Sequence, residues 1–141
     1  QLAPSSLEPD YVDEMRGIVG PLARRMLPAR ALVDAGALVT LSSDWDADDL
    51  SPLVKIETAV TREAQGAPDV ATAIEMLTLN PARLLRQDGR TGSIEAGKFA
   101  DLAIIDRNIL TMPPERISKA RIVATLLQGK AVFDPSGLFA R

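Results

Sequence analysis

The stretch that decides the fold runs from Ala37 to Asp44 and reads ALVTLSSD. Its first six residues are an apolar run of strand length that does not alternate between apolar and polar positions. Such a run is typical of a strand that is buried on both faces, as in a parallel sheet. The sequence therefore predicts a strand over 37–42. In α/β folds, ligands and metals gather at the carboxyl end of such strands, here Ser43 and Asp44.

Helical patterns precede this strand. Residues 10–27 carry apolar side chains at a period close to 3.6, interrupted by glycines, and predict two short helical pieces. Pro28 suits the first turn of a further helix, and Gly36 follows that helix as a C-terminal capping residue would.

Three more helices are expected after the strand. Ser51 and Asp69 each precede an apolar stripe with helical spacing, so both are expected to be N-caps. Asn80 and Pro81 are expected to end the second of these helices and to open the third, as its N-cap and first residue.

The last third of the chain has the pattern of a small sheet. Residues 100–106 and 122–127 predict two strands, and Gln128-Gly129-Lys130 predicts a turn into a third over 131–133. We place a boundary between residues 1–88 and 89–141. Because a buried parallel strand needs neighbours at both edges, these two partial layers suggest a piece of something larger.

Composition excludes several classes of site. The 141 residues include no Cys and no His, so disulfides, thiol nucleophiles, a Ser-His-Asp triad and a His/Cys zinc site are excluded. A net charge of −3 gives no basic surface for nucleic acid or an anionic membrane. No apolar run approaches the roughly 20 residues that span a bilayer. We expect a cytoplasmic protein with neither nucleic acid nor membrane as partner.

An acidic loop follows the predicted strand. Asp44, Asp46 and Asp48 fit positions 1, 3 and 5 of a calcium loop, but Asp49 stands where that loop needs Gly and Lys55 where it needs Glu. Apart from Asp44, these aspartates are interpreted as solvated, one of them capping the next helix. Asp44 differs because it lies directly at the strand end. The neighbouring Trp45 either lines a substrate pocket or packs in the core.

Several motifs together resemble a known family. They are Ser43-Asp44-Trp45, Ala59-Val60-Thr61-Arg62, Thr78-Leu79-Asn80-Pro81-Ala82 and Gly92-Ser93-Ile94-Glu95-Ala96-Gly97-Lys98. From about Ala29 to Phe133 the chain resembles metal-dependent amidohydrolases, in particular the YtcJ-like and N-substituted formamide deformylase-like subgroup. This resemblance implies an α/β fold: the C-terminal portion of a (β/α)8 (TIM) barrel plus the last strands of a small β-sandwich domain.

The resemblance also implies a site. Asp44 corresponds to the family's final metal ligand, which also exchanges protons with the hydrolytic water, so it is both the metal and the catalytic candidate. The implied cofactor is a divalent metal, zinc in one or two copies, whose other ligands lie outside this chain. Ser43, Trp45 and Asp46 are the substrate-pocket candidates. Ser42 and Asp46 depart from the family's usual Gly and Pro, and Asp46 either changes the charge of the pocket or faces water.

The function implied is that of a C-terminal fragment of a hydrolase acting on C–N bonds of small, non-peptide amide substrates. Its partner is the missing N-terminal part of the barrel, with a homo-oligomer as a further expectation, and the chain alone is expected to be inactive. The alternative is a non-catalytic binding or regulatory module derived from an amidohydrolase. A carboxylate-only enzyme such as a glycosidase would need two placed acids in a complete cleft.

Overall fold

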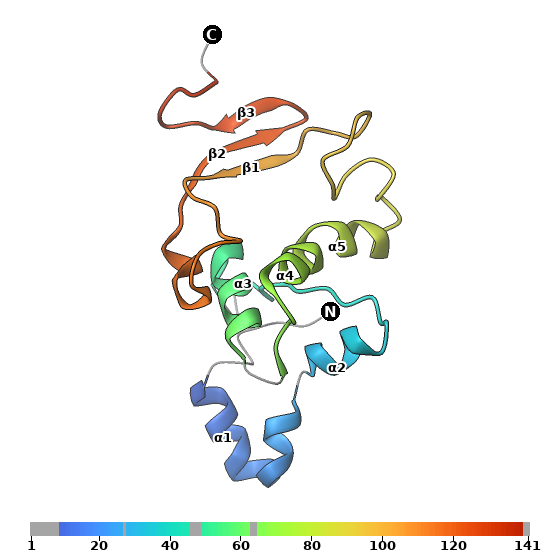
Figure 1. The fold of residues 1–141 in the computed structure, drawn as a ribbon, viewed down its shortest axis with the longest axis vertical. Helices are drawn as coiled ribbons and strands as arrows, with labels where there is room; N and C mark the ends of the chain where they lie inside the picture. The colour runs from blue at the N-terminus through green and yellow to red at the C-terminus, as the bar shows by residue number, and fades with distance from the viewer. Residues whose placement is uncertain (1–8, 27, 46–48, 63–64, 140–141) are drawn as a thin grey trace.

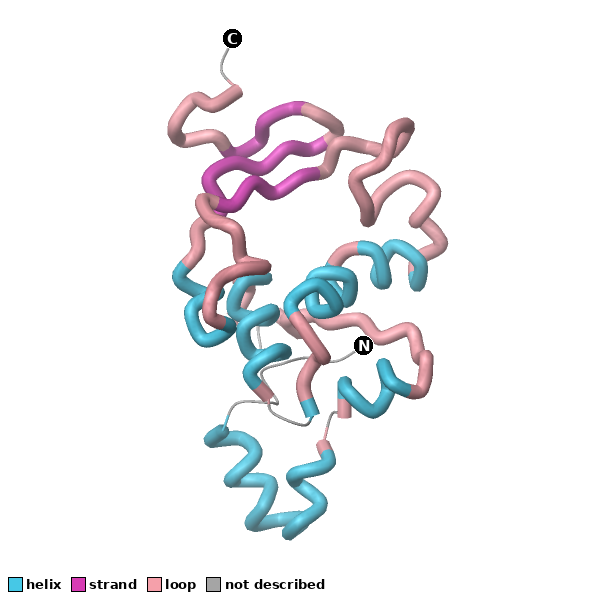
Figure 2. The backbone as a smooth tube through the Cα atoms, viewed as in Figure 1, coloured by secondary structure: helices cyan, strands magenta, loops and turns pink. Residues whose placement is uncertain are grey.

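The structure, a computed structural model, describes residues 9–26, 28–45, 49–62 and 65–139. Apart from one 3₁₀ helix between the first two strands, helices come first along the chain and strands last, and the helices and the sheet occupy opposite ends of the molecule (Figures 1 and 2). The elements are α1 (Pro9–Val19), η2 (Gly20–Arg25), α2 (Ala29–Asp34), α3 (Pro52–Thr61), α4 (Val70–Leu77), α5 (Leu79–Leu84), β1 (Leu102–Ile105), η4 (Pro114–Lys119), β2 (Ile122–Leu127) and β3 (Lys130–Phe133). Among the described residues, no helix is long and apolar enough to cross a membrane.

The first helices form as expected. Helix α1 and the 3₁₀ helix η2 are the two predicted pieces, and α2 ends where Gly36 permits it. Gly36 has a φ of +76°. Its N–H donates to the Val33 carbonyl at 2.8 Å, and the N–H of Ala37 donates to the Leu32 carbonyl at 2.9 Å. These two bonds satisfy carbonyls that the end of a helix leaves without partners.

The predicted strand over 37–42 is wrong. Apart from a single β-bridge at Leu41, these residues belong to no strand. A strand exists through hydrogen bonds to a neighbour along its length, and the three strands that the described residues form all lie in the C-terminal sheet. The expected burial is present nonetheless, because Val39, Thr40 and Leu41 are each only 4% exposed.

The caps of α3 and α4 differ in chemistry. Ser51 occupies the N-cap of α3, but its side chain makes no capping hydrogen bond. Instead the Asp49 carboxylate accepts from the Ser51 N–H at 2.6 Å, so an aspartate of the acidic loop stabilises the start of this helix. At α4 the expected cap is confirmed: Asp69 accepts from the Thr72 N–H at 2.7 Å, and this bond lowers the pKa of Asp69.

The expected cap role of Asn80 is wrong. Helix α5 starts one residue earlier, at Leu79, and Thr78 alone separates it from α4. Asn80 and Pro81 therefore lie inside the first turn of α5. Pro81 costs nothing there because the first N–H groups of a helix have no intrahelical acceptor. The Asn80 side chain bonds elsewhere, as described below.

The predicted strands are confirmed as one antiparallel sheet in the order β1-β2-β3. The turn between β2 and β3 places Gln128 at φ +51° and Gly129 at φ +78°. Two consecutive positive φ values are the mark of the tight hairpin turn whose twist matches that of the strands. The Asp101 carboxylate accepts from the Gln128 N–H at 2.7 Å, which fixes the hairpin against the start of β1.

The core lies between α3, α4 and the 3₁₀ helix η4, which pack together below the sheet (Figure 1). Ile56 of α3 and Ile117 of η4 are both buried. The Glu57 carboxylate of α3 accepts from the Ser118 N–H of η4 at 2.6 Å. A segment of the C-terminal third thus shares its core with the helices, and a domain boundary at residues 88 and 89 stays a prediction.

The Gly-Ser-Ile-Glu-Ala-Gly-Lys stretch forms a closed loop against α5. Lys98 Nζ donates to Ser93 Oγ at 2.6 Å and to Glu95 Oε1 at 3.0 Å. At its start, Gly92 has a φ of +89°, and a Cβ added there would lie 2.6 Å from the Ala82 Cβ of α5. The loop therefore approaches the helix as closely as a backbone without a side chain allows.

One carboxylate joins the end of β1 to the start of β2. Asp106 accepts from Arg107 Nε at 2.9 Å and Nη2 at 2.8 Å, and from the Arg121 N–H at 2.9 Å. The Arg107 side-chain hydrogen bonds, followed by the Arg121 backbone bond, hold the pKa of Asp106 well below its ordinary value of 3.8.

Because Gly92 approaches α5 closely, we predict that a side chain at this position lowers the stability of the fold. Gly92→Ala is expected to lower the free energy of unfolding by about 1–3 kcal/mol, because it adds both a left-handed backbone strain and a steric clash. Urea unfolding followed by circular dichroism measures this. Gly89→Ala is the matched control, since an added Cβ there meets nothing within 4 Å. Equal costs for the two variants would contradict the packing described.

Because the pKa of Asp106 is lowered, we predict that this residue makes the stability of the fold depend on pH. A carboxyl group whose pKa is depressed in the folded state stabilises the fold above its unfolded pKa, and that stability is lost as the pH falls. Between about pH 5 and pH 2 we expect stability to fall less steeply in Asp106→Asn than in the wild type. Some slope remains, because the pKa values of Asp69 and Glu95 are also lowered. Identical slopes in urea titrations would refute this role.

Candidate metal centre

The segment that carries the candidate ligand passes from the core to the surface. Val39, Thr40 and Leu41 are buried, Ser43 is half-buried, and Asp44 and Trp45 are exposed. The Leu41 N–H donates to the Met76 carbonyl at the end of α4 at 2.9 Å. The backbone is thus held where it is buried and reaches solvent at the carboxylate.

Asp44 has an uncommon backbone conformation. Its φ is +52°, in the left-handed region that glycine favours. Aspartate tolerates this region better than most residues, and non-glycine residues held there cluster at functional sites. This conformation occurs where the chain reaches solvent, immediately before Trp45.

The pocket candidates have different surroundings. Trp45 is 67% exposed, so of the two interpretations of this residue, packing in the core is wrong. An exposed indole next to a carboxylate is available to contact a ligand. Ser43 is half-buried between the two environments, and Asp46 lies outside the described residues. The roles of Ser43, Asp44, Trp45 and Asp46 all stay predictions.

A whole metal site is not formed by the residues that the structure describes. Within those ranges, no three His, Cys, Asp or Glu side chains lie close enough together to hold a metal ion. A carboxylate oxygen is a normal zinc ligand, but a zinc site needs three or four such donors. Asp44 therefore fits one position of a metal site, and the remaining donors are not supplied by the described part of the chain.

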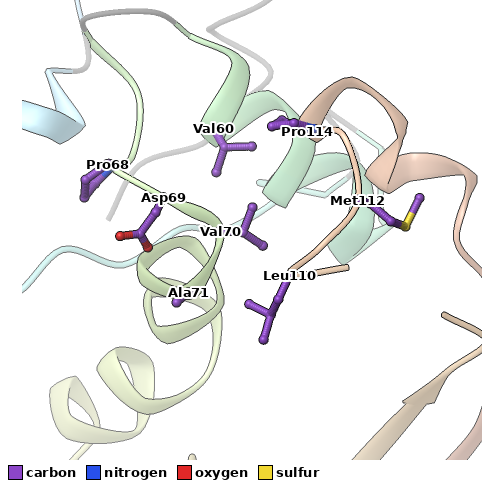
Figure 3. Close-up of a pocket in the computed structure, with 8 residues that line it drawn as sticks. All are labelled: Val60, Pro68, Asp69, Val70, Ala71, Leu110, Met112 and Pro114. Carbon is purple, nitrogen blue, oxygen red and sulfur yellow. The ribbon is translucent and has the colours of Figure 1, made fainter. Parts of the chain in front are cut away.

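Two cavities lie away from Asp44. The smaller, of about 420 Å³, is lined by the start of α4, with Asp69 and Val70, and by the segment that carries Leu110 and Met112 (Figure 3). The Asp69 carboxylate there is already engaged as the α4 cap. The larger, of about 720 Å³, lies between α3, α4, α5 and the β1 and β2 strands. Ser43, Asp44 and Trp45 line neither cavity.

Sequence reasoning did not assign Asn80 to the site, but Asn80 contacts the buried residues that precede Asp44. Asn80 Nδ2 donates to the Val39 carbonyl at 2.9 Å, across 41 residues of sequence. The feature of the sequence that could have pointed to this contact is the Asn80-Pro81 pair. The commonest local role of such a pair is to start a helix, and that role was the one predicted.

The comparisons with known proteins agree with the motifs. A family model described as "Amidohydrolase family" matches residues 2–133. An N-substituted formamide deformylase of Arthrobacter pascens is 32% identical over 121 residues, which cover 80% of this chain and 22% of that protein.

Two solved structures resemble the fold. An amidohydrolase from Thermotoga maritima matches 77% of this chain and 26% of its own, with a TM-score of 0.59 and 30% identity. An adenosine deaminase from Xanthomonas campestris with bound zinc matches 76% of this chain and 28% of its own, with a TM-score of 0.61 and 30% identity. The chain spans about a quarter of the length of these relatives.

Proposed function

Because the chain belongs to the amidohydrolase family, we propose that it is the C-terminal portion of a metal-dependent hydrolase that cleaves C–N bonds of small, non-peptide amides. The observation that carries this proposal is the place of Asp44. It lies at the exposed end of a buried segment, in a left-handed conformation. The motif around it resembles the family motif that contains the last metal ligand. The similarity to an N-substituted formamide deformylase supports a formamide or related amide as substrate.

The proposed architecture is the end of a (β/α)8 barrel followed by the last strands of a β-sandwich. In this arrangement the segment 37–42, which forms no strand among the described residues, would lie beside the upstream strands of that barrel. Strands β1 to β3 form the sandwich part. Upstream strands would also supply the ligands that the described residues do not gather, which is consistent with the quarter of a relative's length that the chain spans.

Asp44 has two proposed tasks. Its carboxylate binds a divalent metal, zinc in the structural relative named above, together with ligands from the rest of the protein. When bound, such a metal would lower the pKa of a coordinated water far below that of bulk water, to about 7. A carboxylate within hydrogen-bond reach takes the proton from the attacking water and returns it to the leaving amine nitrogen. Trp45, Ser43 and Asp46 would line the substrate side of Asp44.

The competing function is a non-catalytic module derived from an amidohydrolase. The absence of a three-ligand cluster among the described residues is compatible with it. The two functions differ in what the upstream polypeptide contributes. A catalytic protein gains histidine or carboxylate ligands there, and a binding module does not.

The first test addresses Asp44 in the longer polypeptide that this proposal requires. Asp44→Asn is expected to remove bound metal and to lower kcat for an N-substituted formamide by about 10²–10⁴-fold, the usual range for loss of a group that transfers protons. Asp13→Asn is a change of the same kind at an exposed position of α1 and is the matched control. It should retain both the bound metal and the wild-type kcat. Full activity in Asp44→Asn would refute the proposal. A wild-type polypeptide without metal or turnover would favour the binding module.

The second test addresses the 141-residue chain alone. One carboxylate does not hold a divalent metal tightly against water, so metal analysis after dialysis should find no stoichiometric zinc. The same preparation should not hydrolyse an N-substituted formamide. Stoichiometric zinc or robust turnover in this chain would contradict the assignment of the other ligands to upstream residues.

A further inference from the structure

The corner between α4 and α5 holds residues 39–41, here called the buried segment, at two points. Asn80 Nδ2, in the first turn of α5, donates to the Val39 carbonyl at 2.9 Å. The Met76 carbonyl, in the last turn of α4, accepts from the Leu41 N–H at 2.9 Å. One bond uses a side-chain donor and the other a helix-end carbonyl that has no intrahelical partner.

These two bonds serve one edge of the segment. Both partners belong to the α4–α5 corner, so the Val39 carbonyl and the Leu41 amide form one acceptor-donor pair on the side that faces this corner. A neighbouring strand normally satisfies such a pair with an N–H and a carbonyl of its own. Here the Asn80 amide takes the place of the strand N–H, and the Met76 carbonyl takes the place of the strand carbonyl.

We infer that Asn80 is a positioning residue for Asp44. Its amide fixes the backbone at Val39, the bond at Leu41 fixes the next point, and Asp44 follows three residues later where the segment reaches solvent. The role in metal binding rests on the proposed function, whereas the role in holding the segment does not. Asn80 does not cap its own helix, since Thr78 occupies that position.

The packing behind Asn80 supports this role. Gly92 packs against the same first turn of α5: a Cβ added to Gly92 would lie 3.1 Å from the Leu79 Cα and 2.6 Å from the Ala82 Cβ. The loop therefore restricts the movement of this turn. A metal ligand needs such support, because residues that orient ligands typically change metal affinity or activity by 10–100-fold when replaced.

The first experiment uses Asn80→Asp in the 141-residue chain. An ionised carboxylate has the shape of the amide but only accepts hydrogen bonds, so the bond to Val39 is lost. We expect the Leu41 amide to exchange with solvent about 10-fold faster, the gain that loss of one such hydrogen bond allows. Amide resonances over 39–45 and the fluorescence of Trp45, the single Trp of the sequence, should change in the folded state.

Asn108→Asp is the matched control. Asn108 is the other asparagine of the chain, and its Oδ1 accepts from the Leu110 N–H at 3.0 Å, a role that a carboxylate keeps. The signals over 39–45 should stay as in the wild type. Asn80→Ala removes the donor without introducing a charge and should reproduce the effects of Asn80→Asp, so the inference does not depend on how one variant folds.

A merely structural role for Asn80 gives a different result. It would lower the urea midpoint and leave the folded-state signals of Leu41 and Trp45 unchanged, and that outcome would overturn the inference. In the longer polypeptide, Asn80→Asp should weaken metal binding by about 10–100-fold. Wild-type metal binding that persists unchanged in Asn80→Asp refutes the inference alone. Metal binding that also persists in Asp44→Asn refutes the proposed function instead.

Discussion

The hydrogen bonding of one buried segment is the constraint on which the helical half of the molecule depends. Val39, Thr40 and Leu41 lie in the core, and buried backbone groups must find partners. An unsatisfied carbonyl or N–H in such a place costs about 1–3 kcal/mol. The α4–α5 corner supplies partners at one edge. Pro81 has no N–H to donate to the Leu77 carbonyl and its ring would clash with that carbonyl in a continuous helix, which explains why α4 stops at Leu77 and α5 restarts after a single residue.

The surface of the chain supports its assignment as a portion of a larger fold. Ile18 is 70% exposed and Ile94 87% exposed, and all four residues of strand β3 are exposed. Monomeric proteins commonly expose single apolar side chains, so the exposed strand β3 is the more informative of these features. Strand β3 also forms an edge of the sheet, and edge strands present unpaired backbone groups that favour pairing with further strands. In the proposed barrel and sandwich, upstream strands and helices would cover these places.

The sequence predicted local features well because their causes are local. Gly36 ends α2, Asp69 caps α4, and Gln128-Gly129 turns the hairpin through contacts a few residues long. The strand over 37–42 and the cap at Asn80 failed because their outcome depends on partners far along the chain. A run of buried apolar residues becomes a strand only beside another strand, and Asn80 bonds a carbonyl 41 residues away. For the site, the pattern predicted the position of Asp44 at the end of a buried run, but the exposure of Trp45 could not be read from its neighbours in sequence.

The family motifs in this chain act more through geometry than through chemistry. The loop that begins at Gly92 packs against α5, α5 presents Asn80 to Val39, and the segment from Val39 leads to Asp44. Of these residues only Asp44 carries a group suited to hydrolysis; the others fix distances between backbone elements. A reactive carboxylate is effective only within a fraction of an ångström of its proper place, so most of the specification of a site goes into its support. This explains why motifs spread over some fifty residues resemble one family although a single side chain among them is the candidate ligand.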